Sequence, residues 1–331
     1  MLPERLHYFQ SWNWSRSAPG ACCSSGILSP LSRWRPGYLL VLVSAFCFAA
    51  GGNVVKALFR LGYSPATLSQ LRLWWAFGWL LVALLLLSPS LLRVHPSELP
   101  ALAVFGGIGL AGVQFSYYLT IARINIAIAL LVQYLGLVGI VAWERFHRSQ
   151  PVGREIWGAL TLVLVGAFFA VGAYRPSLLR VNLPGVGLGL VSAGFFAFYM
   201  LRASTLARRL NTWTILVYGF GTGGVLWAGY DLATRTALPT DWRIWAVMAL
   251  VGLIGTLVGH ALFVIAVRTI RPSAAGIVAT AEPIFAGLIA FAVLGDRLEP
   301  LQAVGAAIVV SGIVTVQLSA REPVMAEAVL Q

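Results

Sequence analysis

Charged side chains are scarce in this chain. Asp, Glu, Lys and Arg make up 10% of the 331 residues and only 11 are acidic, whereas 59% are hydrophobic. Soluble domains carry about 25% charged residues, so an ordinary soluble fold is excluded. The formal net charge of +12 would elsewhere suggest nucleic acid. Here the basic residues lie in short loops between apolar runs, so we expect no nucleic-acid partner.

Cysteine and catalytic motifs are equally scarce. The three cysteines, Cys22, Cys23 and Cys47, have no metal-ligand spacing. The sequence has no HExxH motif, no Walker loop, no Asp-rich diphosphate motif and no CxxC pair. We therefore expect neither a metal nor any other cofactor. An intramembrane lipid-modifying enzyme would need clustered carboxylates or histidines at one membrane face, but Asp231 and Asp241 are isolated in loops.

What the chain has instead is a series of long apolar runs, separated by prolines and short polar loops. The runs predict an all-α polytopic membrane protein that crosses the lipid bilayer with ten transmembrane helices. The expected spans are 38–59, 66–87, 99–121, 124–143, 157–174, 184–206, 213–232, 244–267, 273–294 and 301–319. Residues 1–36 lack the apolar core of a signal peptide and are expected to be a disordered cytoplasmic tail.

The basic residues also predict an orientation. With the N-terminus inside, 14 Lys or Arg residues lie on the inner side and 7 on the outer side, while Lys56 and Arg72 lie within spans. Cytoplasmic loops carry an excess of Lys and Arg, so both termini are expected in the cytoplasm, including a C-terminal tail of residues 321–331. The expected location is the cell (inner or plasma) membrane.

The two halves of the chain resemble each other. Pro36-Gly37 and Pro184-Gly185 each open a span at an offset of 148 residues, and Gly158 matches Gly305 at an offset of 147. Five spans per unit give the two units, residues 37–175 and 184–320, opposite orientations in the membrane. Two inverted five-helix repeats that meet at the bilayer midplane are typical of secondary transporters.

Glu282 is the principal candidate for a functional residue. It lies about nine residues into the run 273–294, roughly 13 Å from its start at ~1.5 Å per residue, and Pro283 follows it. An ionised carboxylate at that depth costs several kcal/mol unless it is protonated, paired or facing a wet cavity. Glu282 is therefore either a cavity group that binds a proton or an ammonium group, or a partner for backbone freed around Pro283 or for a basic residue.

Other polar and aromatic side chains lie at similar depth and could line a cavity with Glu282. Alternatives are helix packing for the aromatic residues, an ion pair for Arg72, and a hydrogen-bonded core position for His260. The candidate substrate-binding residues are Asn53, Arg72, Gln114, Tyr118, Gln133, Tyr134, Tyr199, His260 and Glu282.

Several of these residues belong to motifs that resemble a known family. The stretch EPIFAGLIAFAVLGDRL, residues 282–298, is similar to the signature of the drug/metabolite transporter superfamily, EamA type. Asn53-Val54-Val55-Lys56 and Leu71-Arg72 resemble the pattern of its first repeat, whereas Gly136-Leu137 stands where an Ala-Pro is common. The resemblance covers about residues 37–319. It implies a ten-helix, gradient-linked carrier of small metabolites in a family whose members include amino-acid exporters.

These observations favour a secondary active transporter that works by alternating access between two inverted repeats. We expect a small-molecule substrate, namely an amino acid or a related amine moved outward, with a proton as the candidate coupling ion. The protein is expected to be a monomer or a homodimer. The alternatives are a membrane-embedded non-catalytic subunit and the intramembrane lipid-modifying enzyme considered above.

Overall fold

The computed structural model describes residues 36–148, 152–175, 182–234, 238–294 and 299–319. Within these ranges the chain is helical and contains no strand, as the apolar runs predict. The expected C-terminal tail lies outside the described residues, and so does the expected N-terminal tail up to residue 35.

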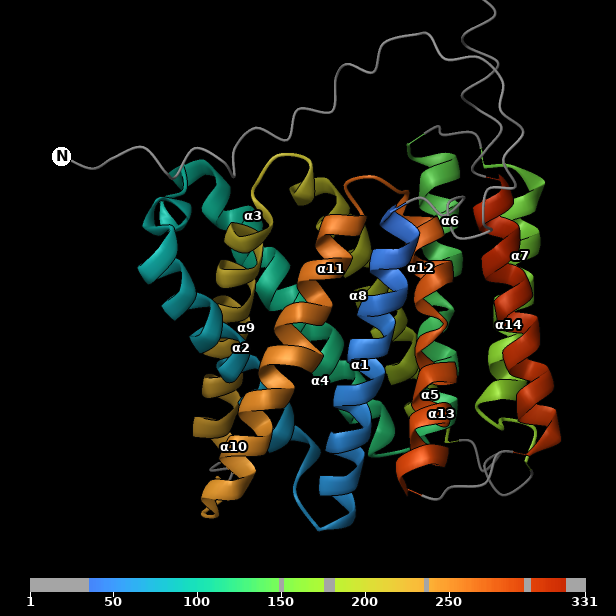
Figure 1. The fold of residues 1–331 in the computed structure, drawn as a ribbon, viewed down its shortest axis with the longest axis horizontal. Coiled ribbons are helices and arrows are strands. Elements are labelled where there is room, and N and C mark those ends of the chain that lie inside the picture. The colour runs from blue at the N-terminus through green and yellow to red at the C-terminus, as the bar shows by residue number, and fades with distance from the viewer. Residues whose placement is uncertain (1–35, 149–151, 176–181, 235–237, 295–298, 320–331) are drawn as a thin grey trace, which may run out of the picture. The chain divides into compact units, whose positions relative to one another are not determined.

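The helices follow the order of the apolar runs (Figure 1). The first half contains α1 (Pro36–Arg60), α2 (Pro65–Leu87), α3 (Leu99–Val104), η5 (Phe105–Ala111), α4 (Gly112–Ile121), α5 (Ile126–Tyr134), α6 (Gly136–Phe146) and α7 (Arg154–Ala170), with the short turns η3 (Pro89–Leu92) and η4 (Pro96–Glu98) after α2. The second half contains α8 (Leu183–Ala207), α9 (Thr212–Thr234), α10 (Trp242–Leu250), η7 (Val251–Val258), α11 (Gly259–Ala266), α12 (Pro272–Ala279), α13 (Glu282–Leu294) and α14 (Pro300–Ser319).

Eight of these helical stretches are long and apolar enough to cross a membrane, which confirms a multi-pass α-helical membrane protein. Helices α7 and α9 are not among the eight, so a total of ten crossings stays a prediction. The expected span 157–174 is wrong at its end. Helix α7 stops at Ala170 because Gly172 adopts a φ of +74°, a left-handed conformation that ends the helix.

The two halves share the same irregularities. Each has a π-helical turn in its third run, η5 in one half and η7 in the other. In each half the fourth run is interrupted, between α5 and α6 at Leu135 and between α12 and α13 at Thr280 and Ala281. These parallels are consistent with the duplication predicted from the sequence. The inverted relation of the two halves stays a prediction.

The two interruptions have different causes. Pro283 has no N–H to donate, and the turn before it is closed by Thr280, whose Oγ1 donates to the Ile277 carbonyl at 2.5 Å. The first half has no proline at the matching place. There, α6 begins at Gly136, where an added Cβ would lie 2.4 Å from the Ala193 carbonyl oxygen of α8. Close packing against α8 therefore requires glycine at the start of α6.

Helices α7 and α14 pack backbone against backbone. An added Cβ on Gly305 would lie 2.3 Å from the Ala170 nitrogen and 2.7 Å from the Gly166 carbonyl oxygen. A Cβ on Gly166 would in turn lie 2.7 Å from the Val309 nitrogen. Small residues permit such close contact between membrane helices. The α7–α14 pair is therefore joined mainly by these glycine contacts.

This packing predicts opposite effects for two glycines that match each other in the internal repeat. Gly305→Ala is expected to lower stability by roughly 1–3 kcal/mol, because backbone atoms cannot move away from the new methyl group. Gly158 on α7 has no atom within 4 Å of an added Cβ. Gly158→Ala is therefore expected to be neutral or to stabilise by up to about 1 kcal/mol through helix propensity. Thermal unfolding of the two purified variants in detergent measures the difference, and equal melting temperatures would contradict it.

Candidate substrate-binding site

A cavity of about 740 Å³ lies between the helices of the two halves. Residues of α1, α2, α4 and α5 form one part of its wall, and residues of α8, α11 and α13 form another. Ligand pockets for small molecules have volumes of about 300–1,000 Å³. The cavity is therefore large enough for a metabolite together with water.

The structure brings all nine of the predicted site residues to this cavity. Its wall includes Asn53, Arg72, Gln114, Tyr118, Gln133, Tyr134, Tyr199, His260 and Glu282. They come from seven helices and are up to 229 positions apart in the chain, from Asn53 to Glu282. Whether each of them contacts a substrate stays a prediction.

The cavity wall contains more basic than acidic side chains. Among the described residues that line the cavity, Glu282 is the one acidic side chain, whereas Lys56, Arg72 and Arg175 are basic. Glu282 is the first residue of α13, directly after the interruption of the run. In the described part of the chain its carboxylate makes no hydrogen bond and no ion pair within 4.0 Å. The alternative in which Glu282 is fixed by a basic residue therefore has no contact to support it.

Two amide side chains of the wall hold neighbouring helices together. Asn53 Nδ2 donates to the Ala49 carbonyl of its own helix at 2.9 Å and to the Ala286 carbonyl of α13 at 3.1 Å. Gln133 Nε2 donates to Ser192 Oγ of α8 at 2.8 Å. These contacts position α13 and α8 beside the first half, so both amides have a structural role in addition to any contact with substrate.

Four buried polar atoms of the wall have no hydrogen-bond partner in the described structure. They are Arg72 Nε, Gln114 Oε1, and the hydroxyl groups of Tyr134 and Tyr199. Buried polar atoms are costly unless they are hydrogen-bonded, so such groups are available to a polar ligand or to water. They supply both donors and acceptors, as recognition of a small polar molecule requires.

His260 combines a structural contact with a place in the wall. Its Nδ1 lies 2.7 Å from the Thr256 carbonyl oxygen, and its ring packs edge-on against Phe48, Tyr199 and Phe220 at 4.8, 6.0 and 5.5 Å between centroids. Tyr118 is likewise tied to a neighbouring helix by the hydroxyl of Ser69. The aromatic residues thus pack together and line the cavity at once.

Sequence reasoning left some wall residues out of the candidate set. Tyr117 and Lys56 both line the cavity, although neither was among the candidate residues. Tyr117 shares a helix face with Gln114, and Lys56 belongs to the Asn53–Lys56 motif. Arg175 and Gln302 were missed because they lie at helix ends, where polar residues are common and carry no special signal.

The cavity extends towards one end of the helices, which we call the open end. Its wall there includes Phe59 at the end of α1, Ile121 at the end of α4, Ala127 near the start of α5 and Gln302 near the start of α14. Successive runs alternate in direction, so these helix ends lie on the same side. This side is the lower edge of Figure 1, where α1 ends and α14 begins.

The opposite end, which we call the closed end, is joined by polar contacts between the halves. Glu144 near the end of α6 is fully buried and accepts hydrogen bonds from Ser273 at the start of α12, from N–H at 3.1 Å and from Oγ at 2.5 Å. Arg148 Nη2 donates to Thr205 Oγ1 near the end of α8 at 2.8 Å. None of these four residues lines the cavity.

A multi-pass helical protein with one polar-lined cavity between its halves has the architecture of a membrane transporter. A model of the EamA-like transporter family matches residues 35–172 and again residues 183–318. The chain therefore belongs to the EamA-like transporter family. It is a membrane transporter and not an enzyme, which removes the lipid-modifying alternative.

Individual relatives agree with this assignment. The chain is 25% identical over 292 residues to YicL of Salmonella typhimurium, an uncharacterized inner membrane transporter, covering 87% of this chain and 97% of the relative. It is 26% identical over 294 residues to the threonine/homoserine exporter RhtA of Escherichia coli, covering 86% and 93%. A protein crystal structure with 20% identity has the same fold, with a TM-score of 0.72 over 86% of this chain and 97% of that one.

Proposed function

We propose that this protein is a secondary transporter that exports amino acids and related small zwitterionic metabolites, and that a proton exchanges with the substrate at Glu282. The observation that carries the proposal is the combination of Glu282 with Arg72 in the wall of one cavity. An amino acid has one ammonium and one carboxylate group, and these side chains offer one partner for each. The threonine/homoserine exporter among the relatives supports the same substrate class.

The uncharged part of the wall suits such a substrate. Amides such as Gln114 and phenols such as Tyr134 and Tyr199 provide hydrogen bonds, while Phe196 and Phe263 provide apolar surface. A short polar or apolar side chain of an amino acid would find partners of both kinds. Broad acceptance of several amino acids follows from a wall of this composition.

Transport by alternating access requires that the cavity open to one side at a time. The open end and the closed end described above support such a cycle. In the orientation predicted from the basic residues, both termini are cytoplasmic and the open end faces outward. The two halves, residues 37–175 and 184–320, are then the inverted repeats that move relative to each other.

Counterflow in proteoliposomes tests the substrate class. Liposomes that contain the purified protein are loaded with unlabelled L-threonine or L-homoserine, and uptake of the labelled amino acid is measured. We expect uptake well above that of protein-free liposomes, and none when the liposomes are loaded with a sugar phosphate. The three basic residues of the wall also suit a phosphate, so uptake driven by sugar phosphates and not by amino acids would overturn the proposal. Absence of uptake with both classes would contradict the proposed substrate class and would point to another kind of small metabolite.

A further inference from the structure

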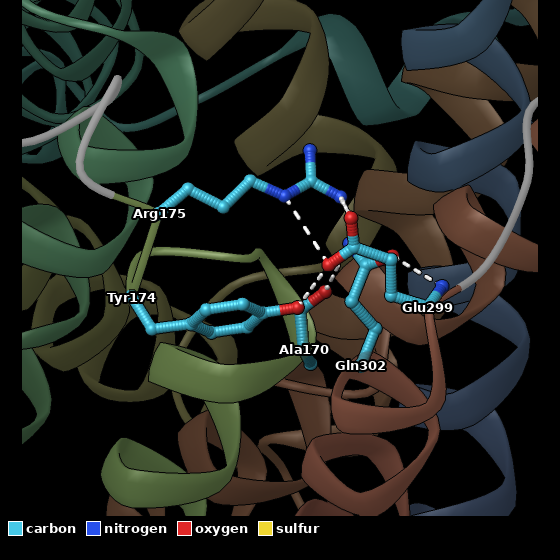
Figure 2. Close-up of polar contacts among 5 residues, drawn as sticks. All are labelled: Ala170, Tyr174, Arg175, Glu299 and Gln302. Atoms are coloured by element: carbon cyan, nitrogen blue, oxygen red, sulfur yellow. Dashed lines mark hydrogen bonds and ion pairs between the residues drawn. The ribbon is translucent and has the colours of Figure 1, made fainter.

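A group of four polar residues lies where the cavity meets the open end. It consists of Tyr174 and Arg175, which follow α7, and Glu299 and Gln302 at the start of α14; we call these residues the rim cluster (Figure 2). The Glu299 carboxylate binds the Arg175 guanidinium through both oxygens, Oε1 to Nη2 at 2.7 Å and Oε2 to Nε at 3.3 Å. The Tyr174 hydroxyl donates to the same Oε2.

The local backbone directs these side chains towards each other. The left-handed Gly172 turns the chain after α7, so that Tyr174 and Arg175 face the start of α14. Gln302 Oε1 accepts the Glu299 N–H at 3.0 Å, and Gln302 Nε2 donates to the Ala170 carbonyl at 3.4 Å. Gln302 therefore caps both helix ends, and the Glu299 carboxylate is free to bind Arg175.

The ion pair contributes little to the folding of this region. The side chains of Arg175 and Glu299 are 39% and 45% exposed, and partly exposed ion pairs add little stability. The glycine contacts of Gly166 and Gly305 already hold α7 against α14. The ion pair joins the end of α7 in the first half to the start of α14 in the second half, where the glycine contacts already keep the two helices together without it.

Its position suits contact with substrate instead. Arg175 and Gln302 line the cavity, so the guanidinium is reached by a molecule that passes between the cavity and the open end. The side chains need only rotate to exchange partners, since both are exposed. A zwitterion that enters the pair would place its carboxylate on Arg175 and its ammonium on Glu299.

We propose that the rim cluster is a second substrate site, which binds the α-carboxylate and α-ammonium groups of an amino acid as it passes the open end of the cavity. This site rests on the proposed function, and it adds a specificity filter beyond the central cavity. Glu299 competes with the substrate carboxylate for Arg175, so binding is weak and release is fast, as an exit site requires. Molecules that have only one of the two charges leave part of the cluster unpaired.

The local contacts favour the ionised form of Glu299. Hydrogen bonds from Tyr174 and Arg175, together with the charge of Arg175, hold the pKa of Glu299 below its usual range. The hydrogen bond to Glu299 raises the pKa of Tyr174, so the phenol stays protonated and continues to donate. A carboxyl with a lowered pKa loses its charge only at more acidic pH, so Glu299 is expected to stay ionised at neutral pH.

Inhibition of L-homoserine counterflow in proteoliposomes tests the site. Two probes each lack one charge: 4-hydroxybutyrate has no ammonium group, and 3-aminopropan-1-ol has no carboxylate. Arg175→Gln is expected to raise the half-inhibitory concentration of 4-hydroxybutyrate about fivefold and to lower that of 3-aminopropan-1-ol, because Glu299 loses its competing partner. Glu299→Gln is expected to do the reverse. Both variants are expected to raise the half-saturation concentration of L-homoserine.

Two controls separate binding from structure. Arg209 forms an ion pair away from the cavity, in which its Nη2 lies 3.6 Å from Glu98 Oε2. Arg209→Gln breaks this pair and is expected to change neither the inhibition by the two probes nor the half-saturation concentration of L-homoserine. The double variant Arg175→Glu with Glu299→Arg preserves an ion pair but exchanges its charges, so it is expected to keep the melting temperature while the half-saturation concentration of L-homoserine, which carries both charges, stays raised. A wild-type half-saturation concentration of L-homoserine in the double variant would show that the pair is only structural and would overturn the proposal.

The remaining outcomes distinguish failure of the rim site from failure of the proposed function. If wild-type protein exchanges L-homoserine but both single variants respond to the two probes as wild type does, the rim site is wrong and the proposed function stands. If the variants weaken both probes equally, the cluster only shapes the mouth of the cavity, and the rim site is again wrong. If the wild-type protein exchanges no amino acid, the proposed function fails and the rim site fails with it.

Discussion

Glu282→Gln is expected to insert and fold like the wild type but to lose proton-driven transport. Glutamine keeps the shape and the hydrogen-bonding capacity of the side chain and fixes its neutral form. In the wild type, an ionised Glu282 is costly at this depth unless a substrate ammonium or water reaches it, so proton and substrate compete for one carboxylate. Without a titratable group at this position, a proton gradient has no site at which to exchange with the substrate.

Proteoliposomes distinguish the two activities of this variant. With an imposed pH gradient, accumulation of labelled L-threonine by Glu282→Gln is expected to fall to the level of protein-free liposomes. Exchange without a gradient is expected to continue, with a higher half-saturation concentration, because an amide attracts an ammonium group less strongly than a carboxylate does. Glu155→Gln, at an exposed acidic residue in the first turn of α7, is the matched control and is expected to behave like the wild type.

A wild-type response to the gradient in Glu282→Gln would contradict the exchange mechanism. Glu282 would then have only a structural role in the interrupted run before Pro283, which is the alternative that the sequence left open. Loss of both driven transport and exchange would instead assign Glu282 to substrate binding without a role for the proton. The experiment therefore separates three roles for one side chain.

The polar residues of the cavity wall could be predicted because the helices are surrounded by lipid. A polar side chain deep in an apolar run cannot face lipid at low cost, so it faces either protein or a cavity. Depth along each run was therefore enough to select Gln114, Gln133 and Glu282 for one cavity wall. The resemblance to the EamA type added Asn53 and Arg72, which also line it.

Polar residues at helix ends were not predictable by the same argument. At such positions water and lipid headgroups are available, so Arg175 and Glu299 carry no cost that must be explained. Their pairing joins residues 124 positions apart, and a single sequence contains no signal for such a contact. Glu144 shows the same limit: the fourth span was expected to end at residue 143, but α6 continues to Phe146 and Glu144 is fully buried.

That buried carboxylate predicts a conformational effect. Glu144 accepts two hydrogen bonds from Ser273 and holds the end of α6 against the first turn of α12, at the closed end of the cavity. A carboxylate at a helix N-terminus also interacts favourably with the helix dipole. Hydrogen bonds to charged groups contribute about 1.5–3 kcal/mol each, so their loss is comparable with the few kcal/mol that typically separate two conformations of a protein.

Glu144→Ala is therefore expected to populate conformations in which the closed end is open. Ala203 of α8 is fully buried and lies about one turn beyond Met200, which lines the cavity. A cysteine at position 203, in a background without the three native cysteines, is expected to be nearly inert towards a thiol reagent in the otherwise wild-type protein. With Glu144→Ala its labelling rate is expected to rise by about tenfold for each 1.4 kcal/mol of lost stabilisation of the closed state.

Ser273→Ala and Glu155→Ala complete the series. Ser273→Ala removes one of the two hydrogen bonds and is expected to give an intermediate labelling rate, whereas Glu155→Ala removes an exposed carboxylate of α7 and is expected to change nothing. A lower melting temperature in Glu144→Ala without faster labelling at position 203 would mean that Glu144 stabilises the fold and does not bias the cycle. Faster labelling at an unchanged melting temperature would identify the α6–α12 contact as the element that keeps the cavity closed at this end.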